Sequence, residues 1–203
     1  MIPVQPDRRH RRLRWRQAKL VALDFETTGL EASDEVVSFG AVPIDEGRID
    51  LGEAEYREAA PTVPISRRSV TIHELRPSDL AGAPPIADAA AELARRLDGR
   101  FLLAWSADIE IAFLRRLYGG SIRRWRRRTI DVLPLAVAAD RELHRTVERR
   151  GYQLGVAATR FGVPLERTHH ALDDAFMTAE LFLILATRLG DPRVSALLRR
   201  GRG

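Results

Sequence analysis

The chain has 203 residues, of which 45% are hydrophobic, and it carries a formal charge of +5 from 33 Lys and Arg against 28 Asp and Glu. This length and composition suffice for one domain with a sizeable core. The absence of cysteine excludes disulfides, zinc–thiolate sites and thiol catalysis, and no apolar run is long enough for a membrane span or a secretory signal. We therefore expect a soluble cytoplasmic protein without membrane association.

The positive charge is concentrated near the N-terminus. Residues 1–19 hold seven basic residues and one acid, so the remaining 184 residues hold 26 basic and 27 acidic groups. Such a segment either attracts phosphate backbones without regard to sequence or is a solvated, disordered leader. We expect residues 1–18 to form a basic, flexible arm.

The first predicted element is a strand over residues 19–26, whose apolar run ends in Asp24 and Glu26. Side chains two residues apart on a strand lie on the same face of the sheet. Two carboxylates placed side by side at the edge of a core repel each other and lose hydration, unless a cation lies between them. Oxygen ligands favour Mg²⁺ or Mn²⁺, so the segment predicts a divalent metal site. The alternative is a strand end with two solvated acids before a Thr-Thr-Gly turn.

Two more strands are predicted at Val36–Val42 and near residues 48–57, followed by a long proline-containing stretch that is interrupted around Val70–Leu75. Apolar residues at helical spacing then predict a helix over residues 86–97, and Phe101–Trp105 is a short apolar strand.

The rest of the chain alternates predicted helices and strands. Ser106 is expected to cap a helix that turns Ile109, Phe113 and Leu117 inward. After it come a short strand or strand-to-helix turn at residues 129–133, a helix marked by Leu154, Ala157, Ala158 and Phe161, and a largely buried helix over about residues 171–189. This order predicts an α/β fold with a mixed central sheet of about five strands flanked by helices.

The last predicted helix opens with the segment His169-His170-Ala171-Leu172-Asp173-Asp174-Ala175. A histidine five residues before an aspartate, at a loop-to-helix junction, can bring an imidazole and a carboxylate to one site, and histidine is the usual base near neutral pH. The alternative is an acid-rich helix N-terminus, where both aspartates complement the helix dipole.

Together these segments resemble the DEDDh exonucleases, a family that includes the proofreading subunit of bacterial DNA polymerase and RNase T-like enzymes. The motif Asp-x-Glu-Thr-Thr-Gly-Leu is matched at residues 24–30, and His-x-Ala-x-x-Asp-Ala at residues 169–175. The register selects His169 over His170 and Asp174 over Asp173. The resemblance implies a ribonuclease H-like fold, with an exonuclease domain at residues 19–190 and a short C-terminal tail at 191–203.

The chain departs from the family at the second motif. In place of His-Asn-Ala-x-Phe-Asp it has Trp105-Ser106-Ala107-Asp108-Ile109-Glu110, so the aspartate position holds Glu110, a side chain longer by one carbon–carbon bond of about 1.5 Å. In the family this acid often reaches the metal through water, which a longer carboxylate allows. Alternatively the site is damaged and Glu110 merely lies on a helix surface. Asp108 is expected to point elsewhere, and Trp105 to pack in the core.

The resemblance implies hydrolysis of the terminal phosphodiester bond at the 3′ end of single-stranded nucleic acid, with DNA favoured, releasing nucleoside monophosphates. Two Mg²⁺ or Mn²⁺ ions about 4 Å apart are implied. Asp24, Glu26, Asp174 and Glu110 would be the metal ligands, and His169 would take the proton from the attacking water. An exonuclease of RNA or short oligonucleotides, and a catalytically weak module that binds nucleic-acid ends, remain as alternatives.

Three residues are implied to bind the substrate. Thr27 would position the terminal sugar, and Leu30 would either wedge beside the last base or pack within its loop. His73 belongs to a segment, Ile72-His73 followed by Leu75, that resembles the family's substrate-contacting Val-His-Gly-Ile stretch.

A second basic cluster, Arg123–Arg128, surrounds Trp125. It either tracks a phosphate backbone and stacks on a base, or forms a solvated loop with the indole tucked into the body. The short segment 191–203 favours a free-standing nuclease over a polymerase-tethered subunit. A homodimer, as in some relatives, and polymerase association through another surface both stay open.

Overall fold

The structure is a computed structural model that describes residues 2–164 and 169–201. Met1 and residues 202–203, which belong to the predicted arm and tail, lie outside the described residues. Six strands form one sheet in the order β3-β2-β1-β5-β6, with β4 also paired to β2. The strands are β1 (Leu20–Thr27), β2 (Val36–Asp45), β3 (Arg48–Ile49), β4 (Glu55–Glu58), β5 (Phe101–Ala104) and β6 (Thr129–Asp131). β1 is antiparallel to β2 and parallel to β5, and β5 is parallel to β6, which confirms a mixed α/β sheet.

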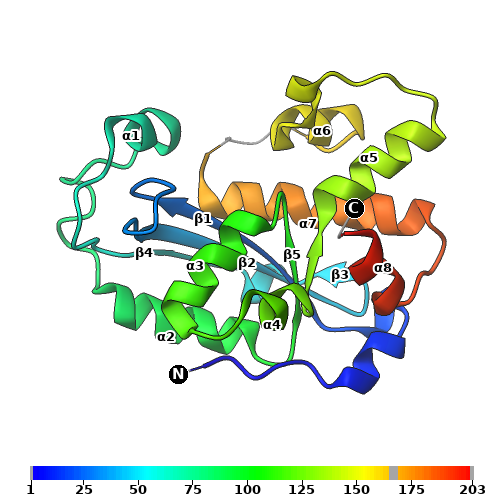
Figure 1. The fold of residues 1–203 in the computed structure, drawn as a ribbon, viewed down its shortest axis with the longest axis horizontal. Coiled ribbons are helices and arrows are strands. Elements are labelled where there is room, and N and C mark those ends of the chain that lie inside the picture. The colour runs from blue at the N-terminus through cyan, green and yellow to red at the C-terminus, as the bar shows by residue number, and fades with distance from the viewer. Residues whose placement is uncertain (1, 165–168, 202–203) are drawn as a thin grey trace.

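Helices cover both faces of this sheet. They are α1 (Arg67–His73), α2 (Ile86–Leu97), α3 (Asp108–Tyr118), α4 (Ile122–Arg126), α5 (Val132–Glu142), α6 (Leu154–Arg160), α7 (Ala171–Arg188) and α8 (Val194–Arg200). Figure 1 shows α2, α3 and α4 on one side of the sheet and α5, α6 and α7 on the other. Among the described residues, no helix is long and apolar enough to cross a membrane.

The alternation of side chains along β1 divides the core into two clusters. Leu20 and Ala22 pack with residues of α5, α6 and α7, whereas Val21, Leu23 and Phe25 pack with residues of α2 and α3. The even-numbered side chains of β1 therefore face α7. Because Asp24 and Glu26 continue the even-numbered series, the strand directs both toward the face that α7 covers.

The segment near residues 48–57 forms two strands rather than the single strand predicted. β3 pairs with one end of β2, through Ile44 and Ile49, and β4 pairs with its other half. A short 3₁₀ helix at Leu51–Glu53 separates them, and the Asp50 side chain caps it by accepting a hydrogen bond from Gly52 N at 3.1 Å. This local cap interrupts the edge, so the sheet has six strands instead of about five.

The predicted cap of the helix after β5 and the inward position of Ile109 are wrong. The other two predicted inward residues are confirmed, since Phe113 is buried and Leu117 packs half-buried against the core. Ser106 has φ +59° and makes no cap, and instead Asp131 accepts hydrogen bonds from Ser106 N at 3.1 Å and Ala107 N at 3.2 Å. This contact from β6 sets where α3 begins and hence its rotation. Ile109 is consequently exposed, and the buried side chains include Glu110, Ile111, Phe113, Leu114 and Tyr118.

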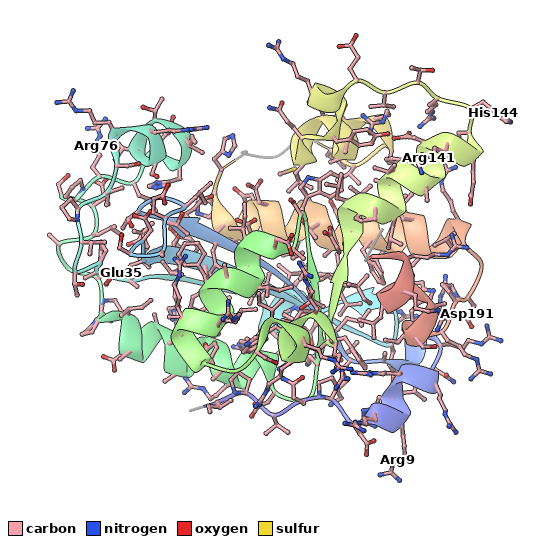
Figure 2. The ribbon with its side chains drawn as sticks, viewed as in Figure 1. Arg9, Glu35, Arg76, Arg141, His144 and Asp191 are labelled. Atoms are coloured by element: carbon pink, nitrogen blue, oxygen red, sulfur yellow. The ribbon has the colours of Figure 1, made fainter. Side chains whose placement is uncertain are left out.

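The N-terminal segment packs against the domain instead of extending from it as a flexible arm. Trp15 is 1% exposed and makes an edge-on contact with Phe182 of α7, with ring centroids 5.6 Å apart. The segment also pairs with the chain before α8, through Trp15 N to Pro192 O and Val194 N to Leu13 O. Asp191, labelled in Figure 2, lies near Arg14 and Arg16 on this side of the molecule. The basic N-terminal segment and the C-terminal segment thus both belong to the folded domain.

Candidate active site

Three carboxylates from the two ends of the chain meet at the carboxyl end of β1. One ligand atom from each of Asp24, Glu26 and Asp174 lies within 4.8 Å of the others. The first two come from β1 and the third from the first turn of α7. The prediction that these acids from distant segments meet at one place is therefore confirmed as geometry.

The acids in this cluster strongly destabilise one another's charge. Burial raises the pKa of Glu26 to about 8 and that of Asp174 to about 6, and it raises the pKa of Asp24 well above its usual value. Repulsion adds to burial, because Asp174 raises the pKa of Glu26, and both acids together with Glu110 raise that of Asp24. Such a site favours either protons or cations over bare negative charge.

Glu110 lies inside the protein, which excludes the interpretation that it only covers a helix surface. Its side chain is 4% exposed, and burial followed by repulsion from Asp131, Asp108 and Glu26 raises its pKa to about 8. It stands beside the three clustered acids and outside the group whose ligand atoms lie within 4.8 Å. Asp108 points elsewhere as predicted, because its side chain is 78% exposed and pairs with Arg126 at 2.8 Å.

At the start of α7 the two neighbouring histidines have different partners, and so do the two neighbouring aspartates. His169 has φ +64°, and its backbone N–H donates to Asp174 Oδ2 at 3.1 Å. His170 stacks on Tyr56, with ring centroids 4.5 Å apart, and its Nδ1 lies 3.3 Å from Asp173. His170 and Asp173 are thus engaged with each other and with β4, whereas Asp174 joins the acidic cluster.

Gly40 is a residue of this site that the sequence reasoning missed. It is the register partner of Asp24 across β1 and β2, and a Cβ atom at this position would overlap the Ala171 carbonyl and the Leu172 Cα. α7 therefore begins directly on the backbone of β2, which brings Asp174 close to Asp24. A glycine inside a strand pattern is the signal that could have indicated this close approach.

The three residues predicted to bind substrate lie around the end of β1. Thr27 is buried and its hydroxyl donates to Gly29 O at 2.8 Å, whereas Leu30 is 67% exposed and so does not pack within its loop. His73 Nδ1 accepts a hydrogen bond from Leu75 N at 3.1 Å, so its Nε2 carries the proton and donates to Thr27 O at 3.2 Å. His73 thereby connects α1 to the end of β1. Direct contact of these residues with substrate stays a prediction.

The two tryptophans that the sequence analysis considered both take structural positions. Trp105 follows the end of β5 and is half-buried against the core, with its Nε1–H donating to Tyr152 O at 3.2 Å. Trp125 is fully buried and donates to Gly119 O at 2.9 Å, so it is unavailable for stacking on a base.

A cavity of about 580 Å³ opens beside the acids, between α6 and the start of α7. His169 and Asp174 lie on one side of it, and Leu154, Val156 and Thr159 of α6 on the other. Val156 is 48% exposed, so this wall offers an apolar surface next to the carboxylates.

The acidic cluster fits a divalent cation. Asp174 Oδ1 and Glu110 Oε2 are buried and have no hydrogen-bond partner among the described residues, although a carboxylate oxygen buried in this way ordinarily has one. All the groups are oxygen donors, which suit Mg²⁺ or Mn²⁺.

The comparisons with known proteins agree on one family. A family model described as exonuclease, of the RNase T type, matches residues 21–182. A PolC-type DNA polymerase III of Thermotoga petrophila is 35% identical over 170 residues, which are 82% of this chain and 12% of that protein. A DNA polymerase III subunit epsilon-like protein of Rhodobacter capsulatus is 32% identical over 172 residues, or 83% of this chain and 24% of the relative. The chain thus spans a quarter or less of these two relatives.

A solved structure with the same fold is the zinc-bound complex of Escherichia coli exonuclease I with single-stranded DNA. It matches with a TM-score of 0.73 and 20% sequence identity, over 88% of this chain and 42% of the other. This similarity confirms the predicted ribonuclease H-like arrangement of sheet and helices.

Proposed function

The chain belongs to the RNase T-type exonuclease family, and on this basis we propose that it is a metal-dependent 3′→5′ exonuclease of single-stranded nucleic acid, DNA in preference to RNA. The observation that carries the proposal is the meeting of Asp24, Glu26 and Asp174 within 4.8 Å. The preference for single-stranded DNA draws support from the likeness to the exonuclease I complex.

In this proposal Asp24, Glu26 and Asp174 hold the cations, and Glu110 supports them from its buried position behind the cluster. Bound divalent ions would stabilise the negative charge that develops on the attacking and leaving oxygens. Two neighbouring residues fix the geometry of the acidic cluster. Gly40 lets α7 approach β2, and the His169 N–H orients the Asp174 carboxylate.

His169 is the proposed base. The proposal draws support from His169 lining the cavity together with Asp174, and in it an imidazole nitrogen of His169 takes the proton from the water that attacks the terminal phosphodiester. Thr27 and Leu30 then flank the terminal nucleotide, the first near its sugar and the second, with its exposed side chain, against its base.

The test is incubation of 5′-labelled DNA and RNA oligonucleotides with Mg²⁺ or Mn²⁺. The proposal predicts a ladder that shortens from the 3′ end, releases nucleoside monophosphates, and disappears with EDTA or in Asp24→Ala. Shortening of RNA alone would move the preference to RNA. Tight binding of ends without any cleavage would instead identify a catalytically weak module.

Association with a DNA polymerase is a second arrangement, which the names of the two relatives favour. A free-standing nuclease is the other arrangement. Gel filtration of the purified chain, alone and mixed with a replicative polymerase, distinguishes them and also reports a homodimer.

A further inference from the structure

The N-terminal segment and α4 together enclose a second hollow, separate from the acidic site. It has a volume of about 790 Å³, and five arginines line it, namely Arg8, Arg11, Arg123, Arg124 and Arg127. Its remaining lining residues are uncharged. We call this hollow the basic groove. It joins the two basic clusters that the sequence shows far apart, at residues 8–16 and 123–128.

The walls of the basic groove are held in place. Val4 N donates to Asp98 Oδ1 at 2.7 Å, and Gly99 N donates to Val4 O at 3.1 Å, so the N-terminal segment is tied to the turn between α2 and β5. Across the groove, the Arg11 guanidinium donates to Arg127 O at 2.9 Å. The groove therefore has a defined shape instead of consisting of a mobile basic tail against a surface.

The positive charge in the groove is poorly compensated. Within residues 2–164 and 169–201, Arg8, Arg123, Arg124 and Arg127 form no ion pair with a carboxylate, and Arg124 Nε is buried without a hydrogen-bond acceptor. By contrast, the neighbouring Arg9 and Arg126 are paired with Asp7 and Asp108. Like charges gathered around one hollow attract a polyanion, because its binding relieves their mutual repulsion.

Neighbouring hollows that share lining residues extend from the basic groove along α4 toward the start of α3. A hollow of about 460 Å³ shares Arg123 and Arg127 with the groove and adds Arg126. The next, of about 380 Å³, shares Arg126 and reaches Ala107 and Asp131, at the start of α3. Glu110 lies in that first turn of α3. A strand that leaves the acidic site past the start of α3 would follow these hollows along α4 to the groove.

We propose that the basic groove binds the phosphodiester backbone of the nucleic-acid strand at nucleotides remote from the 3′ end. This inference rests on the proposed function for the identity of the ligand. An acidic peptide would also pair with arginines, but only the substrate strand is already held at its other end by the acidic site, which raises its effective concentration at the groove.

The groove contacts phosphates and does not read bases. The indole within the cluster, Trp125, is fully buried, and none of the residues lining the groove is aromatic. Guanidinium groups bind phosphate oxygens through paired hydrogen bonds whatever the base. The binding is therefore independent of sequence and falls steeply with salt.

The position of the groove sets a minimum length for a substrate that uses it. β1 runs from Leu20, next to the strand ends near α4, to Glu26 at the acidic cluster, and six residues at about 3.3 Å each span about 20 Å. Figure 1 shows the N-terminal segment passing beneath α4 at the opposite end of the sheet from α1 and the start of α7. A trinucleotide has only one phosphodiester besides the one at the acidic site, and one backbone repeat is far shorter than this distance, so a trinucleotide cannot reach both sites.

The test compares two triple variants with equal loss of charge. The groove variant is Arg8→Ala/Arg123→Ala/Arg127→Ala. The control is Arg48→Ala/Arg141→Ala/Arg199→Ala, three exposed arginines that lie outside the groove. Figure 2 shows Arg141 at the far end of α5. Binding of a labelled 30-nucleotide single strand and of a 30-base-pair duplex is measured by anisotropy in EDTA over a range of salt, and kcat and KM for the 30-mer and a trinucleotide are measured with Mn²⁺.

We expect the groove variant to bind the 30-nucleotide strand about tenfold more weakly, with a salt slope less steep by about 2, since each lost phosphate contact contributes about 0.7. Its KM for the 30-mer rises, while kcat and the trinucleotide KM do not change. A loss on the single strand or the duplex supports the groove, and the larger loss identifies the strand form. Unchanged binding of both, or an equal loss in the control variant, would overturn the inference.

A further measurement distinguishes a failure of this inference from a failure of the proposed function. If a polyglutamate of equal charge binds the groove as tightly as the 30-mer, the assignment to nucleic acid is wrong even if the protein is an exonuclease. If no DNA or RNA is cleaved but the groove variant still loses binding selectively, the groove stands and the proposed hydrolysis fails.

Discussion

Removing one carboxylate from the acidic cluster should stabilise the protein when no metal is bound. Glu26 is 8% exposed, and burial with repulsion from Asp174 raises its pKa from 4.5 to about 8. The folded protein therefore binds the proton more tightly than the unfolded chain does. By linkage, the stability that this group contributes is complete below about pH 4.5 and is lost as the pH rises through about 8.

The magnitude follows from the same shift. At pH 7 the unfolded chain has an ionised Glu26 and the folded one a protonated Glu26, and a separation of about 2.5 pH units corresponds to about 3 kcal/mol. Relaxation of the site and entry of water reduce this, so we expect Glu26→Gln to raise the free energy of unfolding in EDTA by the order of 1–2 kcal/mol at pH 7. The gain should disappear at pH 4.

The assay is urea unfolding, followed by circular dichroism in EDTA at pH 4, 7 and 8.5, for the parent and for Glu26→Gln. Glu142→Gln, at an exposed position on α5, is the matched control and should change little at any pH. Saturating Mn²⁺ should stabilise the parent and the control, but Glu26→Gln much less. If Glu26→Gln were less stable than the parent in EDTA at pH 7, the carboxylate would be making structural bonds, and the reasoning from repulsion would be refuted.

Substitutions at three further residues test the other parts of the site. Glu110→Asp should retain activity and Glu110→Ala lose most of it in steady-state cleavage assays; full activity of the alanine variant would remove Glu110 from the site. His169→Ala should lower kcat at least a hundredfold while Mn²⁺ affinity, measured calorimetrically, stays largely intact, and unchanged turnover would refute its role as base. Gly40→Ala should push the start of α7 away from β2, lowering stability by about 1–3 kcal/mol and weakening Mn²⁺ binding, whereas Gly82→Ala, with no neighbour within 4 Å, should do neither. Equal Mn²⁺ affinity in both glycine variants would contradict the positioning role of Gly40.

The sequence allowed a correct prediction of those features that follow from local periodicity. The period of two along β1 places Asp24 and Glu26 on one face, whatever the rest of the chain does. The register of the family motif, rather than periodicity, selected Asp174, which joins the cluster while Asp173 pairs with His170. The apolar residues after Thr178 predicted a buried helix, and α7 is buried over most of this stretch.

Features that depend on distant contacts were not predictable in this way. The start of α3 is set by the Asp131 carboxylate, which accepts hydrogen bonds from N–H groups 24 and 25 residues away. The Ser106 cap and the inward position of Ile109 were therefore predicted wrongly, whereas Phe113 and Leu117 do face the core. The N-terminal segment was expected to be flexible because of its charge, yet one residue, Trp15, anchors it against Phe182. In both cases a single long-range contact outweighs the local pattern.

The most direct test of the central claim is a crystal structure of the protein soaked with Mn²⁺ and a nucleoside monophosphate, with anomalous diffraction recorded for manganese. The account predicts anomalous peaks between Asp24, Glu26 and Asp174, with Glu110 behind them and the monophosphate oxygens in contact with the ions. Crystals saturated with Mn²⁺ that show no peak there, with the Glu26 and Asp174 side chains turned apart, would contradict it.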